Sequence, residues 1–173
     1  MKGLSIILVL IFQYFFSSSQ GSGEIIRFES ANPFSFNDII DNLENQESQE
    51  VFGRLIFPDD SSHMNKKYPL IIGVAGSLGW ADHHFEYMKM YRDMGIATFE
   101  LNSFQSRDVI STVGTQVEVT TASMILDAYR AFEKLSEHPR IDNDRVSITG
   151  WSLGGGVTLF SACLLYTSDA ADE

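Results

Sequence analysis

Ser152 lies in the pentapeptide Gly150-Trp151-Ser152-Leu153-Gly154, which has the pattern Gly-x-Ser-x-Gly. In this pattern the serine occupies a sharp turn between a strand and a helix, so that its Oγ is exposed. A serine hydroxyl becomes a nucleophile when a neighbouring base removes its proton. The pentapeptide therefore predicts nucleophilic attack by Ser152 on an acyl carbon. The alternative is a glycine-rich turn that presents a solvent-facing serine.

A serine nucleophile also requires N–H donors for the oxyanion of the tetrahedral intermediate. We expect one donor to be the backbone N–H of Leu153, because the residue after the nucleophile supplies it in such turns. The second should come from the loop Gly76-Ser77-Leu78-Gly79, which follows an apolar run and contains two glycines. Either Ser77 or Leu78 is expected to donate its N–H, and an ordinary glycine turn is the alternative.

The base and the acid that such a serine needs are not evident. In this arrangement the triad runs serine, Asp or Glu, then His along the chain. All the histidines precede Ser152; they are His63, His83, His84 and His138. His83 and His84 either line the substrate pocket or form a solvated helix N-terminus, which we favour, and His138 ends a helix. The catalytic Asp and His are therefore predicted to be absent from this chain.

The elements around these residues alternate between strand and helix. Apolar or β-branched runs predict strands at 25–28, 51–58, 68–76, 96–101 and 145–149. Apolar residues at helical spacing predict a short helix at 36–43, one at 82–94 and a long one that carries Ala122 to Leu135. A further helix should follow Ser152. Strands that alternate with helices predict an α/β fold with a mostly parallel sheet and helices on both faces.

Three glycines in succession, Gly154, Gly155 and Gly156, begin that last helix. Each costs a helix about 1 kcal/mol relative to alanine, so they need a reason. We expect close approach between this helix and the sheet to require them.

The first 19 residues resemble a secretory signal peptide. Lys2 provides a positive start, 4–16 is apolar, and Ser17-Ser18-Ser19 offers small residues for cleavage. The apolar run is shorter than the roughly 20 residues of a membrane-spanning helix, although an uncleaved anchor is the alternative. A periplasmic or secreted protein is therefore expected.

The last residues, 163–173, resemble the translation of a transposon-end sequencing adapter, so they are expected to be a non-native tail. Asp169 and Asp172 follow Ser152 but belong to this tail, as does the only cysteine, Cys163. Residues 20–162 would then form one incomplete domain. A net charge of −11 and the lack of a basic run argue against a nucleic-acid partner or a membrane contact beyond the signal peptide.

Three segments carry a resemblance to a known family. Tyr68 to Trp80, the connection from His138 to Arg145, and the stretch from Ile148 to Gly155 resemble the dienelactone-hydrolase-related branch of the α/β-hydrolases. The resemblance implies the N-terminal portion of that fold, from about Val51 to Ala162, with the later strands missing. Many relatives carry His-Gly where this chain has Ala75-Gly76, and dienelactone hydrolases proper carry a cysteine where this chain has Ser152.

These observations predict a serine hydrolase that acts on a small-molecule carboxylic ester or a related acyl compound through an acyl-enzyme on Ser152. No cofactor or metal is expected, and the fragment itself is expected to be inactive. One alternative is a peptidase similar to prolyl oligopeptidase, since Gly-Trp-Ser-x-Gly-Gly also occurs there. Another is a hydrolase-fold binding protein that has lost catalysis.

Overall fold

The computed structural model describes residues 23–59 and 66–169, and the predicted signal peptide lies outside them. These residues form an α/β fold in which strands and helices alternate from β3 onward. The strands are β1 (Glu24–Ala31), β2 (Ser48–Ile56), β3 (Tyr68–Val74), β4 (Ala97–Leu101) and β5 (Ile141–Gly150). The helices are α2 (Phe36–Ile40), α3 (Asp82–Asp93), α4 (Thr121–Ser136) and α5 (Leu153–Asp169), with short 3-10 turns at Leu43–Asn45 and Gln105–Arg107.

The described strands form a single sheet in the order β1-β2-β4-β3-β5. Strands β4, β3 and β5 are parallel neighbours, whereas β2 is antiparallel to both β1 and β4. Four strands therefore run in one direction and only β2 opposes them, as the prediction of a mostly parallel sheet requires. The register places Val74 beside Leu101 on one side and beside Gly150 on the other. The carboxyl ends of β3, β4 and β5 thus lie together at one edge.

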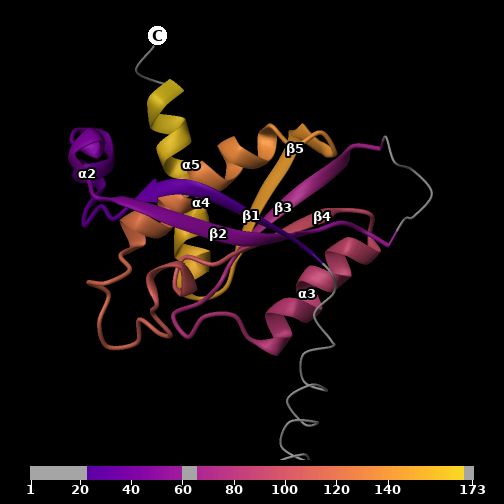
Figure 1. Ribbon diagram of the computed structural model, residues 1–173, viewed down its shortest axis with the longest axis horizontal. Helices are drawn as coiled ribbons and strands as arrows, with labels where there is room; N and C mark the ends of the chain where they lie inside the picture. The colour runs from indigo at the N-terminus through magenta and orange to yellow at the C-terminus, as the bar shows by residue number, and fades with distance from the viewer. Residues whose placement is uncertain (1–22, 60–65, 170–173) are drawn as a thin grey trace, which may run out of the picture.

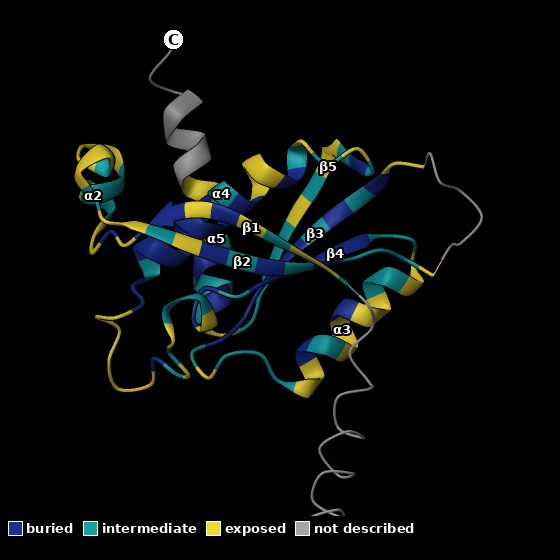
Figure 2. Cartoon of the chain, viewed as in Figure 1, coloured by how far each residue is buried: buried dark blue, intermediate teal, exposed yellow. Residues whose placement is uncertain are grey.

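Helices cover both faces of the sheet, as predicted (Figure 1). A Cβ added at Gly73 would meet Met88 of α3, whereas Ile72 lines a groove with Ala128 of α4. Because successive residues of a strand face opposite sides, α3 lies on one face and α4 on the other. Helix α5 packs against α4, β5 and β3. The core between these layers is apolar and is buried in Figure 2; its largest members include Tyr68, Phe99, Leu70, Met124 and Ile125.

The predicted strands and helices are confirmed with changed bounds. The helix predicted at 36–43 ends at Ile40 and the strand predicted at 68–76 ends at Val74, whereas other elements are longer than the sequence indicated. Strand β2 begins at Ser48 rather than Val51, because its polar first residues pair with the end of β1. Strand β5 begins at Ile141 rather than Arg145, because Ile141 pairs with Tyr68 before a bulge. The backbone of α5 is helical to Asp169, so it continues into the segment 163–173.

Strand β5, which carries the chain into Ser152, is an edge strand of the described sheet. Only β3 pairs with it, and Asn143 to Arg145 and Ser147 are exposed. This agrees with the expected N-terminal portion of the fold, from which the later strands are missing. One of the two edges of the described sheet, that of β5, therefore lies next to Ser152.

Candidate active site

Ser152 occupies the turn between β5 and α5, and it is exposed. Its φ of 52° lies in the left-handed region, which is strained for a residue with a Cβ. The backbone N–H of Trp151 donates to the carbonyl oxygen of Val74 (3.2 Å), and the N–H of Gly154 donates to that of Trp151 (2.9 Å). The turn is thus fixed to β3 on one side and closed by α5 on the other.

At two of the glycine positions around Ser152, there is no room for a side chain. A Cβ on Gly150 would collide with the carbonyl of Gly154, and a Cβ on Gly154 would collide with the carbonyl of Val74. A Cβ on Gly155 would make only an ordinary contact, and one on Gly156 would meet nothing within 4 Å. Close approach therefore explains Gly150 and Gly154, whereas the expectation that it also explains Gly156 is wrong, since that face of α5 is open.

The two expected oxyanion donors come from two segments that meet at this turn. Leu153 is the first residue of α5, where a helix has no internal acceptor for its N–H. Gly76-Ser77-Leu78-Gly79, which we name the oxyanion loop, is a turn closed by the N–H of Gly79 donating to Gly76 (2.9 Å). A Cβ on Gly76 would stand 3.1 Å from the carbonyl oxygen of Trp151 and 3.5 Å from the Cβ of Ser152. The loop therefore lies directly against Ser152.

The carbonyl of Ser77 is held on the far side of the oxyanion loop. It accepts the N–H of Thr112 (2.9 Å) and the hydroxyl of Ser111 (3.1 Å). Among the hydrogen bonds of the described residues, none is donated by the N–H of Ser77 or of Leu78. Both amides thus fit the role of second donor, and the geometry does not choose between them.

An aromatic cluster packs on the turn beside Ser152. The ring of Trp151 lies 4.5 Å from that of His84 and 5.8 Å from that of Trp80, between centroids. His84 is only 5% exposed, so the prediction of a solvated position is wrong for it, whereas His83 is exposed. Nδ1 of His84 accepts the N–H of Ala81 (3.1 Å), which fixes the imidazole. Burial, followed by the like charge of His83, lowers the pKa of His84 below its ordinary value.

His138 lies at the other end of the sheet from Ser152. It follows α4, its ring packs on Phe57 (5.5 Å), and Phe57 packs on Tyr68 at the start of β3. Its Nε2 is 3.5 Å from a carboxylate oxygen of Glu24. His138 therefore belongs to the end of the sheet away from Ser152, while His63 lies outside the described residues. Within the described ranges, no cluster of three or more His, Cys, Asp or Glu could hold a metal ion.

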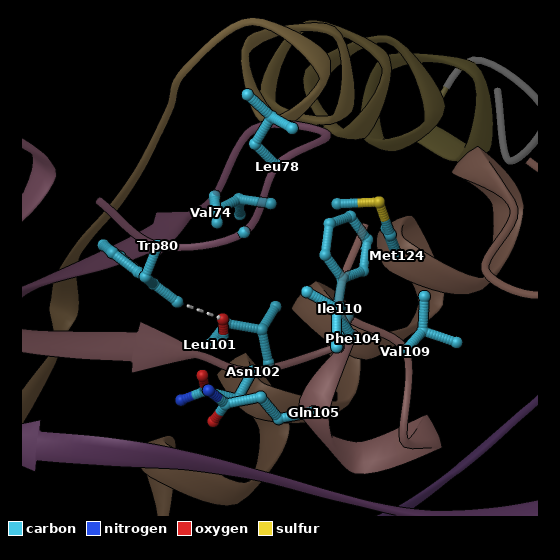
Figure 3. Close-up of a pocket in the computed structure, with 13 residues that line it drawn as sticks. Val74, Leu78, Trp80, Leu101, Asn102, Phe104, Gln105, Val109, Ile110 and Met124 are labelled. Carbon is cyan, nitrogen blue, oxygen red and sulfur yellow. Dashed lines mark hydrogen bonds between the residues drawn. The ribbon is translucent and has the colours of Figure 1, made fainter. Parts of the chain in front are cut away.

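A cavity of about 220 Å³ opens at the carboxyl ends of β3 and β4. Figure 3 shows apolar side chains around it, including those of Val74, Leu78, Phe104, Val109 and Met124. The dashed line marks Nε1–H of Trp80 donating to the carbonyl of Leu101 (2.9 Å), which ties the oxyanion loop's end to β4. Leu78 and Gly79 of that loop line the cavity. The oxyanion loop therefore lines the cavity with Leu78 and Gly79 and lies against Ser152 at Gly76.

A buried ion pair supports the segment after β4, whose residue Ser103 lines the cavity. Arg107 and Asp127 are 4% and 0% exposed, and Nη1 and Nη2 of Arg107 contact the two carboxylate oxygens at 2.8 and 3.0 Å. The guanidinium also donates to the backbone of Ala31 and Ser103 and to the side chain of Asn32. Each of its five N–H groups is thus satisfied. The segment after β4, for which the sequence predicted neither a strand nor a helix, is therefore held in place at Ser103 and Arg107 and lines the cavity with Asn102 to Gln105.

The sequence analysis missed Asp127 and its partner, although a signal was present. Asp127 lies four residues from both Ser123 and Ala131 on the buried face of α4. A carboxylate on an otherwise apolar helix face requires a buried cation or several donors. That residue pattern alone indicates a partner, but it does not say that the partner is Arg107.

The comparisons with known proteins concern the fold and the segment that contains Ser152. The family described as acetyl xylan esterase (AXE1) matches residues 121–171, which is less than half of the chain and contains α4, β5, the serine turn and α5. The solved structures of similar fold include esterases and dienelactone hydrolase-like proteins. The chain has the α/β-hydrolase fold. No curated protein matches it.

Three solved structures illustrate the extent of the match to the α/β-hydrolase fold. A dienelactone hydrolase-like promiscuous phosphotriesterase from metagenomic libraries is 16% identical, with a TM-score of 0.54, over 81% of this chain and 54% of its own. Esterase Est22 is 16% identical, with a TM-score of 0.56, over 88% and 42%. Est1E from Butyrivibrio proteoclasticus is 14% identical, with a TM-score of 0.55, over 83% and 46%. The chain spans about half the length of these α/β-hydrolases.

Proposed function

We propose that this chain carries the nucleophile and the oxyanion hole of a serine hydrolase that acts on a small-molecule carboxylic ester. The observation that carries the proposal is the contact between the oxyanion loop and Ser152. The loop stands against an exposed serine whose backbone is held in the left-handed region. The fold and the esterase family match support the same class of reaction.

In the proposed reaction, Oγ of Ser152 forms a bond to the ester carbonyl carbon while a base accepts its proton. The carbonyl oxygen becomes an oxyanion that accepts the N–H of Leu153 and the N–H of Ser77 or Leu78. The carbon–oxygen bond to the alcohol then breaks, and the alcohol leaves with a proton. Water hydrolyses the acyl-enzyme and returns the serine and a carboxylic acid.

No residue of this chain is assigned as the base, since no histidine follows Ser152. His84 is near the turn, but its Nδ1 accepts the N–H of Ala81 and its ring is packed on Trp151. We therefore propose that the 173-residue chain alone hydrolyses esters no faster than a serine hydrolase from which the catalytic acid and base have been removed. The acid and the base would come from sequence that this chain does not include.

The test compares two polypeptides, this chain and the product of the gene read past Ala162 in a clean assembly. A fluorophosphonate probe should label Ser152 rapidly in the longer product, and Ser152→Ala should abolish the labelling. Ser48→Ala, at an exposed serine of β2, is the matched control and should be labelled like the wild type. Loss of labelling in both variants, or labelling that survives Ser152→Ala, contradicts the proposal.

The longer gene product also distinguishes the proposed serine hydrolase from the alternative, a hydrolase-fold protein that binds a ligand without catalysis. If no Asp or Glu and no His follow Ser152 in it, and the probe does not label it, a hydrolase-fold binding protein becomes the better explanation. Rapid hydrolysis of p-nitrophenyl acetate by the 173-residue chain, lost in Ser152→Ala, would contradict the proposed inactivity of the chain while supporting its nucleophile.

A further inference from the structure

Both tryptophans of the chain border the candidate active site. Trp80 directly follows the oxyanion loop, and Trp151 directly precedes Ser152. Their rings lie 5.8 Å apart between centroids, with 63° between the ring planes, so the contact is edge-to-face. Aromatic pairs prefer this arrangement, and they are stabilised beyond the area that they bury. A side-chain contact therefore joins the two segments that carry the expected oxyanion donors.

Hydrogen bonds do not perform this task. Among those of the described residues, none runs between the oxyanion loop and the turn at 151–153. The N–H of Trp151 donates to Val74, which lies before the loop. The side chain of Leu78, in the middle of the loop, is 74% exposed, so its packing does not fix the loop against the turn. The contact between the two tryptophans thus has a positional role that the backbone leaves open.

Trp80 is held from three sides. Its Nε1–H donates to the carbonyl of Leu101 in β4 (2.9 Å), and its ring stacks on that of Phe85 in α3 at 5.4 Å with 17° between the planes. A Cβ on Gly73 of β3 would stand 2.9 Å from Cη2 of Trp80, so the indole also lies directly on β3. Trp80 is therefore a fixed reference point at the end of the oxyanion loop.

Trp151 takes its position from Trp80 and from α3. Its ring lies 4.5 Å from that of His84 and 6.2 Å from that of Tyr87. His84 in turn contacts Trp80 at 5.8 Å, with 79° between the planes. The rings of Trp80, His84 and Trp151 thus contact one another in all three pairs, and we name these residues the aromatic clamp.

We infer that the aromatic clamp sets the position of the Leu153 N–H relative to the N–H of Ser77 or Leu78, so that both donors reach one oxyanion. The inference rests on the proposed function. Trp80 and Trp151 are positioning residues, because they act through the two segments next to them. Oxyanion donors act within about 2.7–3.1 Å of the oxygen, and removing one donor lowers kcat about 10²- to 10³-fold. Loosening the clamp keeps both donors and misplaces them, so the loss should be smaller.

The kinetic test uses the longer gene product and p-nitrophenyl acetate. Trp151→Leu should lower kcat about 10-fold and leave KM within about twofold, because the donors stabilise the oxyanion more than the substrate. Trp80→Leu should act similarly, and the double variant should be no slower than the slower single variant, because both break the same contact. Trp151→Phe keeps a ring beside His84, so it should lose only about 3-fold, and it replaces Trp151→Leu if that variant does not fold.

Phe57→Leu is the matched control for a loss of stability. It removes an aromatic contact with Tyr68 at the end of the sheet away from Ser152, and it should keep kcat. The clamp itself can be observed in the 173-residue chain without any reaction. Two indoles at this separation should give an exciton couplet in far-ultraviolet circular dichroism. Trp80→Phe or Trp151→Phe should abolish the couplet, and Phe57→Leu should retain it.

Failure of this inference is distinguishable from failure of the proposed function. A folded wild type without the couplet, an equal loss of kcat in Phe57→Leu, or multiplicative losses in the double variant would overturn the clamp. Unchanged kcat in both leucine variants, with Ser152 labelled by the fluorophosphonate probe, would overturn its positioning role alone. A couplet together with no labelling of the longer wild-type product would overturn the serine hydrolase, and the role of the clamp with it.

Discussion

The imidazole of His84 packs against the indole of Trp151, with 4.5 Å between ring centroids and 30° between ring planes. Through this contact the start of α3 supports the residue that immediately precedes Ser152. The imidazole is buried, and Nδ1 accepts a backbone N–H, so the neutral ring is the form that fits. Protonation would place a charge between aromatic rings and beside His83.

This contact should make the stability of the protein depend on pH. Burial lowers the pKa of His84 in the folded state, so below about pH 6.5 the unfolded chain binds more protons. The free energy of unfolding should therefore decrease as the pH falls from about 7.5 to about 5.5. Urea titrations should show a smaller decrease in His84→Gln. His83→Gln is the control and should keep most of the dependence, because it leaves the burial of His84 in place.

Substitution by alanine should change the free energy of unfolding in opposite directions at Gly154 and Gly156, near the start of α5. Gly154→Ala places a methyl group against the carbonyls of Val74 and Ala75, and it should lower the free energy of unfolding by about 1–3 kcal/mol. Gly156→Ala meets open space and gains helix propensity, so it should raise that free energy by up to about 1 kcal/mol. Equal destabilisation by the two substitutions would contradict the packing described for this helix.

The strained backbone of Ser152 gives a third prediction. With φ at 52°, a Cβ is unfavourable by about 1–2 kcal/mol. Ser152→Gly should therefore be more stable than Ser152→Ala by about 1 kcal/mol, as measured by thermal unfolding. Ser48, in the extended strand β2, provides the comparison, since Ser48→Gly there should be less stable than Ser48→Ala.

Removing one partner of the buried pair of Arg107 and Asp127 should strongly decrease the free energy of unfolding. Asp127→Asn leaves the guanidinium without its counter-charge, so the free energy of unfolding should fall by about 3 kcal/mol or more. Asp93→Asn removes the partner of Lys89 in an exposed pair and should cost less than about 1 kcal/mol. A small effect at Asp127 would show that the pair does not support the segment after β4.

Much of the fold was predictable because its signals are local. The turn at Ser152, the apolar strands and the helix of 121–136 depend on residues that are close in the sequence. The burial of His84, the partner of Asp127 and the cavity after β4 depend on contacts between distant segments, such as Ser30 with Asp127 and Trp80 with Leu101. Composition describes 102–115 as polar, and only the fold shows that its first residues line a cavity.

The open edge at β5 leads to the last prediction. An edge strand presents unpaired N–H and C=O groups, which template pairing with another chain. We expect the 173-residue chain and its fragment 20–162 to self-associate through this edge and to be poorly soluble. Ser147 is exposed on β5, so Ser147→Lys should hinder the pairing and reduce the association seen in sedimentation velocity. Ser48→Lys changes the net charge equally at an exposed residue away from this edge. If it reduces association as much, charge rather than the β5 edge governs the self-association.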